Sequence, residues 1–387
     1  MPATPVPVPI DDDRLAWLAL ALAPGLGPRR ILEGVRSLDA PSHIFRISLT
    51  ELEALRFPAH AAQFIFDGKA RQAAEAEWTR VVELGGSILT FGCPDYPERL
   101  KEIYDPPPVL WVKGPTALLA RPSIAVVGTR HPSPYGTGVA EMLARDLAVR
   151  HILIVSGMAR GIDTCAHKGA LAARMPTVAV WGTGLDVVYP KENKKLSEDI
   201  LAAGGAIVSE SPVGTFPAPQ NFPRRNRILS GLSIAVLVVE ASENSGTRVT
   251  ARCAAEQNRD LYAVPGNVTN KNSWTPNTLI KQGAKLVATW EDVWEELPSQ
   301  VRLQLEAIAA DESKPEAPAS VLADPVLRPQ EAMLLEVLRC DESLQIDEIL
   351  ENLETQLTSS EVFTALFELE ITGRIRQLPG KNYVRVL

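Results

Sequence analysis

Cysteine is scarce in this sequence. The 387 residues include 4 cysteines, scattered along the chain without a CxxC motif or a nearby pair of histidines. This pattern excludes a disulfide framework and a zinc site, and is typical of reduced thiols in a cytosolic protein. We therefore expect no bound metal.

A long hydrophobic run is also missing. The apolar stretch "LAWLALALA" (15–23) is far shorter than the ~20 residues of a membrane-spanning helix. The acidic residues of "DDDR" precede it, where a secretory signal would carry positive charge. We expect a cytoplasmic protein with no membrane partner.

The sequence has no overall excess of positive charge, but its charges are unevenly distributed. The net charge is -8, with 39 Lys and Arg against 47 Asp and Glu. Residues 121–230 contain 13 basic and 8 acidic side chains, a balance of +5, whereas residues 291–387 contain 8 and 20, a balance of -12. The whole-chain charge therefore does not exclude an anionic partner for the middle segment.

The central part of the chain alternates short β-branched strands with helical segments. The apolar runs are "SIAVVG" (123–128), "ILIVSG" (152–157), "TVAVWG" (177–182), "AIVSES" (206–211), "SIAVLVVEA" (233–241) and "LYAVPG" (261–266), with further strands at "SILTFG" (87–92), "VLWVKG" (109–114) and "KLVAT" (285–289). Strands that are apolar on both faces and separated by helices are typical of βαβ units. We predict an α/β fold with an extended Rossmann-like, doubly wound, mostly parallel sheet over residues 85–297.

Smaller units flank this sheet. Residues 11–80 are predicted to be a helical domain, broken at "PGLGPRR" (24–30); this segment is either a SAM-like or helix-hairpin-helix turn that can meet a phosphate, or an ordinary glycine helix end. Three helical segments near 330–339, 344–352 and 359–372, with a hairpin around "PGKN", predict a winged helix over 330–387. Residues 1–10 are expected to be disordered and 309–329 to be a linker.

Several catalytic and cofactor signatures are absent. "GTRHPSPYG" follows the first parallel strand in place of GxGxxG, and there is no Walker A spacing. A related group of proteins that cleave nucleoside monophosphates carries PGGxGTxxE, but Thr250 stands where that glutamate belongs. Glu210 and Glu240 have no evident partner carboxylate, and Asp163 is interpreted as a helix N-cap. We expect no cofactor and no enzymatic activity.

Basic residues instead collect in or beside the loops that follow the strands. These residues are Arg130, Arg160, Lys191, Lys194, Lys195, Arg224, Arg225 and Arg227. Because the carboxyl ends of parallel strands share one edge of the sheet, they predict a groove that follows a phosphate backbone. Asn221 and Asn226 could contact base edges, and the rings of Phe216, Phe222, Tyr189 and Trp274 could stack on unpaired bases, which favours a single strand.

The motifs resemble those of the DprA/Smf family of DNA-processing proteins. They are "VVGTR" (126–130), "VSGMARGIDTCAHKGAL" (155–171), "GTGLDVVYPKENKKL" (182–196), "FPRRNRILSGL" (222–232), "SGTRVTA" (245–251) and "YAVPGN" (262–267), in the family's order. The resemblance implies a non-catalytic protein of natural transformation that binds single-stranded DNA, protects it and helps load RecA for recombination. It also implies a homodimer formed through the Rossmann-like domain.

The same resemblance implies a set of DNA-binding residues. Arg130 would grip the phosphate backbone, with the glycine-rich and lysine-rich loops around it. The predicted set is Gly128, Thr129, Arg130, Ser156, Gly157, Met158, Arg160, Gly161, Lys191, Asn193, Lys194, Lys195, Arg224, Arg225, Asn226 and Arg227. We expect "RRNR" in a strand-end loop, where Arg225 and Arg227 either contact DNA or pair with buried carboxylates such as Asp163 or Glu240.

Two departures from the family's pattern are Arg248, where an apolar residue is usual, and "TPNTLI" (275–280), where the family tends to read GTNxLI. The acidic C-terminal unit is expected to contact other proteins or to mediate self-association rather than to bind duplex DNA. Two other hypotheses remain open. A nucleotide sensor or nucleoside-monophosphate-processing enzyme could use the same sheet, or the chain could be a scaffold joined to partners through its terminal domains.

Overall fold

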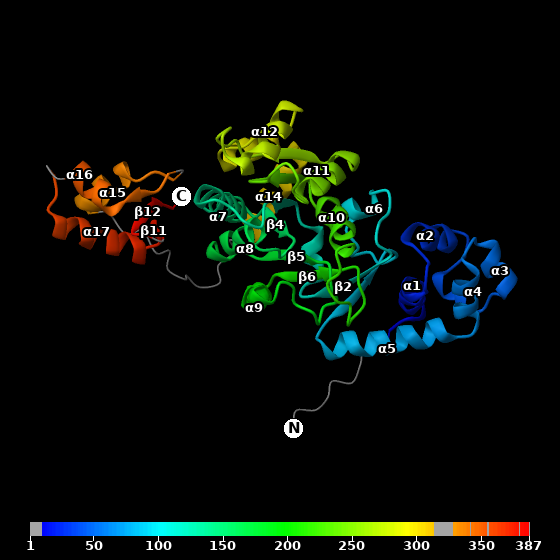
Figure 1. Ribbon diagram of the computed structural model, residues 1–387. Helices are drawn as coiled ribbons and strands as arrows, with labels where there is room; N and C mark the ends of the chain where they lie inside the picture. The colour runs from blue at the N-terminus through cyan, green and yellow to red at the C-terminus, as the bar shows by residue number, and fades with distance from the viewer. Residues whose placement is uncertain (1–9, 313–327, 341, 354–355, 379, 387) are drawn as a thin grey trace, which may run out of the picture.

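The computed structural model describes residues 10–312, 328–340, 342–353, 356–378 and 380–386. Residues 1–9 of the segment expected to be disordered, and most of the linker expected at 309–329, lie outside these ranges. Figure 1 shows N-terminal helices, a central sheet and a C-terminal cluster of helices and strands. Among the described residues, no helix combines the length and the apolar character that crossing a membrane requires.

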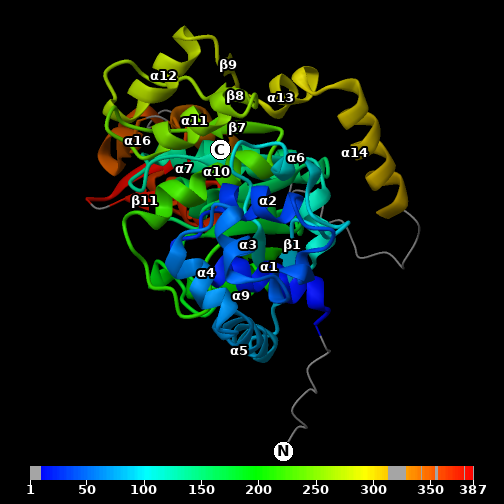
Figure 2. The same ribbon diagram turned by 90° about the vertical axis from the view of Figure 1, so that its right-hand side faces the viewer.

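The N-terminal helices pack on one edge of the sheet (Figures 1 and 2). Asp11 caps the first helix by accepting from the Arg14 amide, and Ser48 forms a capping box with Glu51. Their apolar faces share one buried cluster with Trp111 and Trp181 of the sheet. The helices are α1 (Asp12–Leu22), α2 (Pro28–Arg36), α3 (Leu49–Ala54), α4 (Ala59–Phe66) and α5 (Lys69–Glu83), with a 3-10 turn at Pro41–Phe45.

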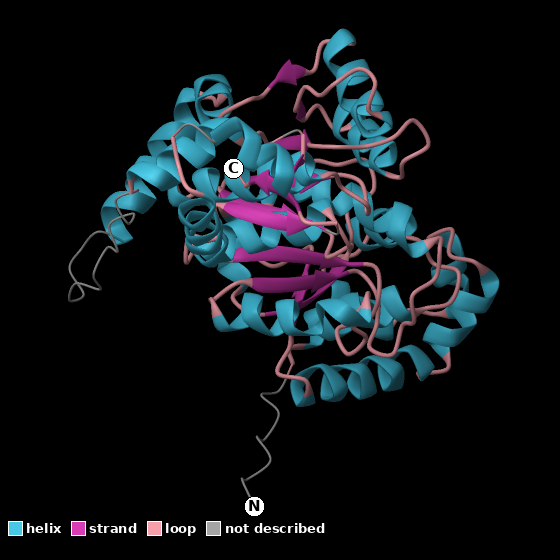
Figure 3. Cartoon of the chain, turned by 60° about the vertical axis from the view of Figure 1, so that its left-hand side comes forward, coloured by secondary structure: helices cyan, strands magenta, loops and turns pink. Residues whose placement is uncertain are grey.

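A nine-stranded sheet forms the centre of the molecule (Figure 3), in the order β1-β2-β6-β5-β4-β3-β7-β8-β9. Strands β3 to β9 pair in parallel, whereas β1 and β2 form an antiparallel edge. This confirms the mostly parallel sheet. The strands are β1 (Ser87–Thr90), β2 (Val109–Lys113), β3 (Ser123–Val127), β4 (Leu153–Ser156), β5 (Thr177–Trp181), β6 (Ala206–Ser209), β7 (Ala235–Val238), β8 (Asp260–Ala263) and β9 (Lys285–Leu286).

Helices cover both faces because alternate residues of each strand point to opposite sides. In β3, Ala125 and Val127 join the apolar cluster of α10 (Asn221–Leu232) and α11 (Thr247–Glu256). Ile124 and Val126 join the cluster of α7 (Pro134–Val149) and α8 (Ile162–Ala172) on the other face. The remaining helices of this region are α6 (Glu98–Lys101), α9 (Lys194–Ala202), α12 (Trp274–Lys281), α13 (Trp290–Glu296) and α14 (Ser299–Glu312).

Two local predictions are wrong. "RRNR" lies on helix α10 and not in a strand-end loop. Pro223 occupies the first turn, where its missing N–H costs nothing, and Ile228, Leu229 and Leu232 give the helix a buried face. The strand predicted at 233–241 begins after this helix, and β7 occupies only four of its residues, Ala235–Val238. Asp163 is not an N-cap either, because Gly161, with φ 74°, occupies that position of α8.

The C-terminal unit has the three helices and the hairpin expected for a winged helix. It contains α15 (Pro329–Val337), α16 (Ile346–Leu353) and α17 (Ser359–Ile371), and the strands β10 (Leu344–Gln345), β11 (Ile375–Leu378) and β12 (Asn382–Arg385) in the order β10-β12-β11. Leu334, Ile349 and Leu366 are among the residues of its own buried core. Helix α14 ends at Glu312, so residues 309–312 of the expected linker are helical.

Candidate functional site

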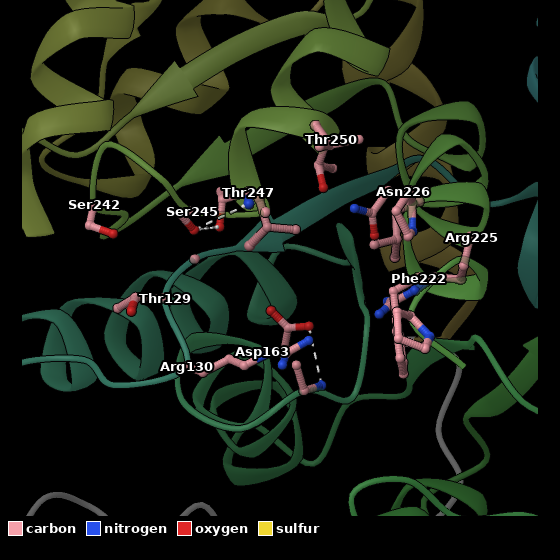
Figure 4. Close-up of a pocket in the computed structure, with 18 of the residues that line it drawn as sticks. Thr129, Arg130, Asp163, Phe222, Arg225, Asn226, Ser242, Ser245, Thr247 and Thr250 are labelled. Carbon is pink, nitrogen blue, oxygen red and sulfur yellow. Dashed lines mark hydrogen bonds between the residues drawn. The ribbon is translucent and has the colours of Figure 1, made fainter. Parts of the chain in front are cut away.

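A pocket of about 590 Å³ opens beyond the carboxyl end of β3, between α10 and α11. Figure 4 shows the side chains of α10, α11 and the loop after β3 around this space, which we call the strand-end pocket. Its position agrees with the rule that ligands of open α/β sheets lie outside the carboxyl ends of the strands. The structure therefore has a cavity at the edge of the sheet where the sequence predicted a ligand site.

The loop after β3 presents Arg130 to the pocket. The Thr129 amide donates to the Glu240 carbonyl at 2.6 Å, and the Thr129 carbonyl accepts from the Ile162 amide at 3.1 Å. A Cβ on Gly128 would lie 2.5 Å from Ile162, so only glycine fits there. Arg130 is exposed, and no carboxylate of the described residues forms a salt bridge with it. The loop is rigid while its cation remains available.

The loop after β4 is held by Asp163. This carboxylate accepts from the amides of Gly157 at 3.1 Å and Ala159 at 3.2 Å. Burial raises the pKa of Asp163, while the nearby Arg225 guanidinium and these amide hydrogen bonds oppose the rise. Among the described residues, both hydrogen bonds that its side chain accepts come from these loop amides. Asp163 thus shapes the pocket wall through the backbone of the glycine-rich loop.

Arg225 forms a buried cationic floor. Its side chain is 7% exposed, and its Nε and Nη1 atoms have no hydrogen-bond partner. Burial lowers its pKa to about 10, with Asp163 acting in the opposite direction. The guanidinium is therefore protonated at neutral pH. Because Arg225 also lines the cavity, it places a buried positive charge at the cavity wall, which favours an anionic ligand.

Arg227 serves a different purpose. It forms a salt bridge with Asp105 at 3.1 Å and a second one with Glu210. Internal pairing is thus correct for Arg227, although its partners are not the expected Asp163 or Glu240. Glu240 instead accepts from the amide and hydroxyl of Ser133, at 2.8 and 2.6 Å, and holds the start of α7.

Aromatic rings line the pocket beside the cations. The rings of Phe222 and Tyr189 lie 5.4 Å apart, and the Arg130 guanidinium lies 5.9 Å from the centre of the Phe222 ring. Asn226 contributes an amide from the same helix as Phe222. These groups combine a flat apolar surface with hydrogen-bonding and cationic groups, as expected for a nucleotide or nucleic-acid site.

The lysine-rich segment supports the pocket from outside. Asn193 is buried and donates to the Met158 carbonyl and the Thr164 hydroxyl, both at 2.9 Å. Lys194 and Lys195 are exposed on α9. Arg160 lines a smaller hollow, which shares Arg130 and Arg225 with the strand-end pocket, and it pairs with Glu192. The prediction that "NKK" lines the pocket therefore changes: its asparagine holds the loop, and its lysines lie on the surface.

The predicted residues fall into three groups. Seven line the strand-end pocket or the smaller hollow that shares part of its lining: Gly128, Thr129, Arg130, Gly157, Arg160, Arg225 and Asn226. Five support it from inside: Ser156, Met158, Gly161, Asn193 and Arg227. Four are exposed and lie outside its lining: Lys191, Lys194, Lys195 and Arg224.

Sequence reasoning missed the wall formed by the start of α11. The pocket is lined here by Ser242, Ser245 and Thr247, and His131 of the loop after β3 also lines it. The Ser245 hydroxyl accepts from the Thr247 amide at 3.2 Å, and the helix begins there without a side-chain cap at Gly246. The motif "SGTRVTA" could have indicated this wall, because a cluster of Ser, Gly and Thr at the start of a helix can bind an anion.

Acid–base and metal chemistry have little support in this pocket. Asp163 is the one carboxylate in its lining, and Thr250 occupies the position where the nucleotide-cleaving proteins have glutamate. Within the described parts of the chain, no group of three or more His, Cys, Asp or Glu side chains is placed to hold a metal ion.

Comparisons with known proteins give a consistent result. The family model described as DNA recombination-mediator protein A matches residues 87–298, and the DprA winged helix domain matches residues 314–381. The chain is 41% identical over 295 residues to Protein Smf of Escherichia coli K12, covering 75% of each chain. It is 42% identical to DNA processing protein DprA of Bacillus subtilis over 219 residues, 56% of this chain and 73% of that one.

A solved structure also resembles this one. The X-ray structure of DNA processing protein A (DprA) from Streptococcus pneumoniae has a TM-score of 0.64 and 33% identity, and covers 75% of this chain and 99% of its own.

Proposed function

This chain belongs to the DNA recombination-mediator protein A family, also called DprA or Smf, and we propose that its strand-end pocket binds single-stranded DNA. The observation that carries the proposal is the meeting of Arg130, Arg225 and Phe222 in one cavity. The exposed cation and the buried cation suit successive phosphates, and the ring offers a surface for a base. A duplex hides its base faces, so stacking on Phe222 requires an unpaired strand.

The wider role follows from this binding. We infer that the protein binds the single-stranded DNA that enters during natural transformation, protects it, and helps load RecA on it for recombination. A protein that holds DNA without cutting it suits this role, and the pocket offers a single carboxylate already committed to loop amides. We propose that it is not an enzyme and that it acts as a homodimer in the cytoplasm.

The binding proposal is tested with a labelled oligothymidine, its duplex counterpart and several salt concentrations. We expect the single strand to bind more tightly, with an affinity that falls steeply as salt rises. Arg130→Ala should weaken binding and reduce the salt slope by about 0.7, the value for one lost contact to a single strand. Arg36→Ala is the matched control, because Arg36 is an exposed arginine on α2 away from the pocket. An unchanged affinity and slope for Arg130→Ala would rule out this pocket.

The competing function is a mononucleotide sensor. The volume of the cavity fits a small ligand, which makes this function worth testing. Pockets of about 300–1,000 Å³ commonly hold small ligands, and this one is about 590 Å³. Free mononucleotides added as competitors separate the two functions. We expect them to displace the oligonucleotide only weakly, since one nucleotide makes few of the contacts. If a mononucleotide displaces the labelled oligonucleotide at a concentration far below the concentration of unlabelled short oligothymidine that does so, the sensor function is favoured.

The RecA role needs its own measurement. Single-stranded DNA coated with a single-strand-binding protein slows RecA assembly, and we expect this chain to restore RecA-dependent ATP hydrolysis on that DNA. Arg130→Ala should lose the effect together with DNA binding. Restoration by the variant at full rate would show that any help to RecA does not use the strand-end pocket.

A further inference from the structure

A second hollow of about 220 Å³ lies between α11 and α12, outside the strand-end pocket. Arg248, Arg252 and Trp274 line it, with Leu261 and Leu279 deeper in the wall. Arg248 is one of the two departures from the family pattern, and Trp274 directly precedes the other. They meet in space: the Arg248 guanidinium lies 5.4 Å from the centre of the Trp274 ring. Neither residue belongs to the strand-end pocket.

The exposed indole and its neighbouring cations have unused binding capacity. Trp274 is 39% exposed, an unusual state for so large an apolar side chain. Arg248 donates to the Glu243 carbonyl at 3.0 Å, and within the described chain no carboxylate forms a salt bridge with it. Arg252 pairs with Glu256 at 2.7 Å, yet its side chain remains 79% exposed. Part of the indole and both arginine side chains are therefore exposed to solvent.

Helix α11 is the wall between the two cavities. Thr247 and Thr250 face the strand-end pocket, whereas Arg248, Arg252 and Ala255 recur at helical spacing on the side of the second hollow. At the top of this wall stands Gly246, where a Cβ would meet nothing within 4 Å. Gly246 therefore has open space beside it at the start of the helix that separates the two cavities.

We propose that this second hollow, the Trp274 subsite, binds a further base of the same DNA strand that occupies the strand-end pocket. The base stacks on Trp274, and Arg248 and Arg252 contact the adjacent phosphates. Stacking on an indole accepts any base, so the subsite adds affinity and length without adding sequence preference. The inference rests on the proposed function, and extends the DNA path over the start of α11.

The alternative is that Arg248 and Trp274 form only a surface clamp between two helices. The two cases differ in how they depend on DNA length. A strand of about six nucleotides can fill the strand-end pocket alone, whereas one of about twenty-four can also reach the second site, given site sizes of about 4–16 nucleotides per module in other single-strand binders. A clamp affects both lengths alike.

The test compares full-length protein, Trp274→Leu and Arg248→Gln with both oligothymidines. We expect Trp274→Leu to weaken binding of the long strand by about 5- to 150-fold, the range for losing one stacked base, with no change for the short strand. Arg248→Gln should reduce the salt slope for the long strand by about 0.7. Trp290→Leu is the matched control, since Trp290 also lies under an arginine, Arg150, but lines neither cavity.

Other outcomes overturn the proposal in distinguishable ways. Equal losses at both lengths, or none at either, exclude the Trp274 subsite while leaving the proposed function intact. If the unmodified protein binds neither strand, the proposed function fails and the subsite fails with it. Light scattering completes the set: if Trp274→Leu converts a dimer to a monomer and weakens both strands equally, this face joins two copies of the chain.

Discussion

Gly157 lies so close to Arg225 that a Cβ at this position would be 1.6 Å from the Arg225 Nη1 atom. The glycine after β4 and the buried arginine of α10 therefore fit together directly, although they are far apart in the sequence. Asp163 fixes the other side of the contact by accepting from the Gly157 amide. The cationic floor of the strand-end pocket depends on the absence of one methyl group.

Gly157→Ala should therefore move Arg225 and disturb the pocket. Overpacking a buried site costs about 1–3 kcal/mol, so we expect a loss of that size in urea unfolding, together with weaker binding of oligothymidine. Gly27→Ala is the control, since a Cβ at Gly27 meets nothing within 4 Å. It should leave DNA affinity unchanged. Normal DNA affinity for folded Gly157→Ala would show that the position of Arg225 is unimportant for binding.

Neighbouring arginines on α10 should respond in opposite ways. Arg227→Ala leaves Glu210 without its buried partner, and breaking such a pair costs about 3–5 kcal/mol. Arg224 is exposed, so Arg224→Ala should change the free energy of unfolding by less than about 0.5 kcal/mol while weakening DNA binding in a salt-dependent way. Unfolding curves and anisotropy titrations of both variants check this. Equal stability of the two would contradict the structural role of the Arg227 salt bridges.

The position of the site could be predicted from sequence because topology restricts it. Parallel strands bring their carboxyl ends to one edge of the sheet. The loops at the ends of "VVGTR" and "VSGMARG" were therefore expected to lie close together. Arg130 could be identified as a ligand contact because it follows such a strand directly. The accompanying "RRNR" was placed in a loop because it precedes a predicted strand; the intervening residues Ile228 to Leu232 in fact continue helix α10 and give it its buried face.

The roles of the buried arginines could not be predicted in the same way. Arg225 and Arg227 are both arginines and lie two residues apart on the same helix. Arg225 nevertheless borders a cavity, whereas Arg227 pairs with Asp105 and Glu210. Asp105 precedes β2, more than a hundred residues earlier in the chain. Local sequence carries no information about such a partner, because the pairing depends on how the antiparallel edge strands join the sheet.

His167 should make the protein less stable in mild acid. It is buried on α8, and burial lowers its pKa to about 3. Because the Thr177 hydroxyl donates to the Ile154 carbonyl at 2.7 Å, the Nδ1 atom of His167 must carry the proton that it shares with Thr177, and Nε2 has no partner. Below the unfolded pKa of about 6.5, the unfolded chain binds a proton that the folded chain excludes. The free energy of unfolding therefore decreases as the pH is lowered.

The size of this effect follows from linkage. Between pH 7 and pH 5, the His167 contribution to the free energy of unfolding should fall by about 2 kcal/mol. Urea unfolding at a series of pH values should show that decline in the unmodified protein and a smaller decline in His167→Gln. Because other titrating groups are common to both proteins, the difference between the two curves isolates His167. Parallel curves would mean that His167 is protonated in the folded state.

Phe222→Leu should separate stacking from charge. Losing a stacked base costs about 1–3 kcal/mol of binding free energy, but it removes no phosphate contact, so affinity should fall while the salt slope stays constant. Phe66→Leu changes an exposed phenylalanine of α4 far from the pocket lining and should have no effect. Arg130 lies over the Phe222 ring, which gives the experiment a second informative result. If the salt slope falls with the affinity, the ring acts by positioning Arg130 rather than by holding a base, and the stacking part of the proposal is wrong.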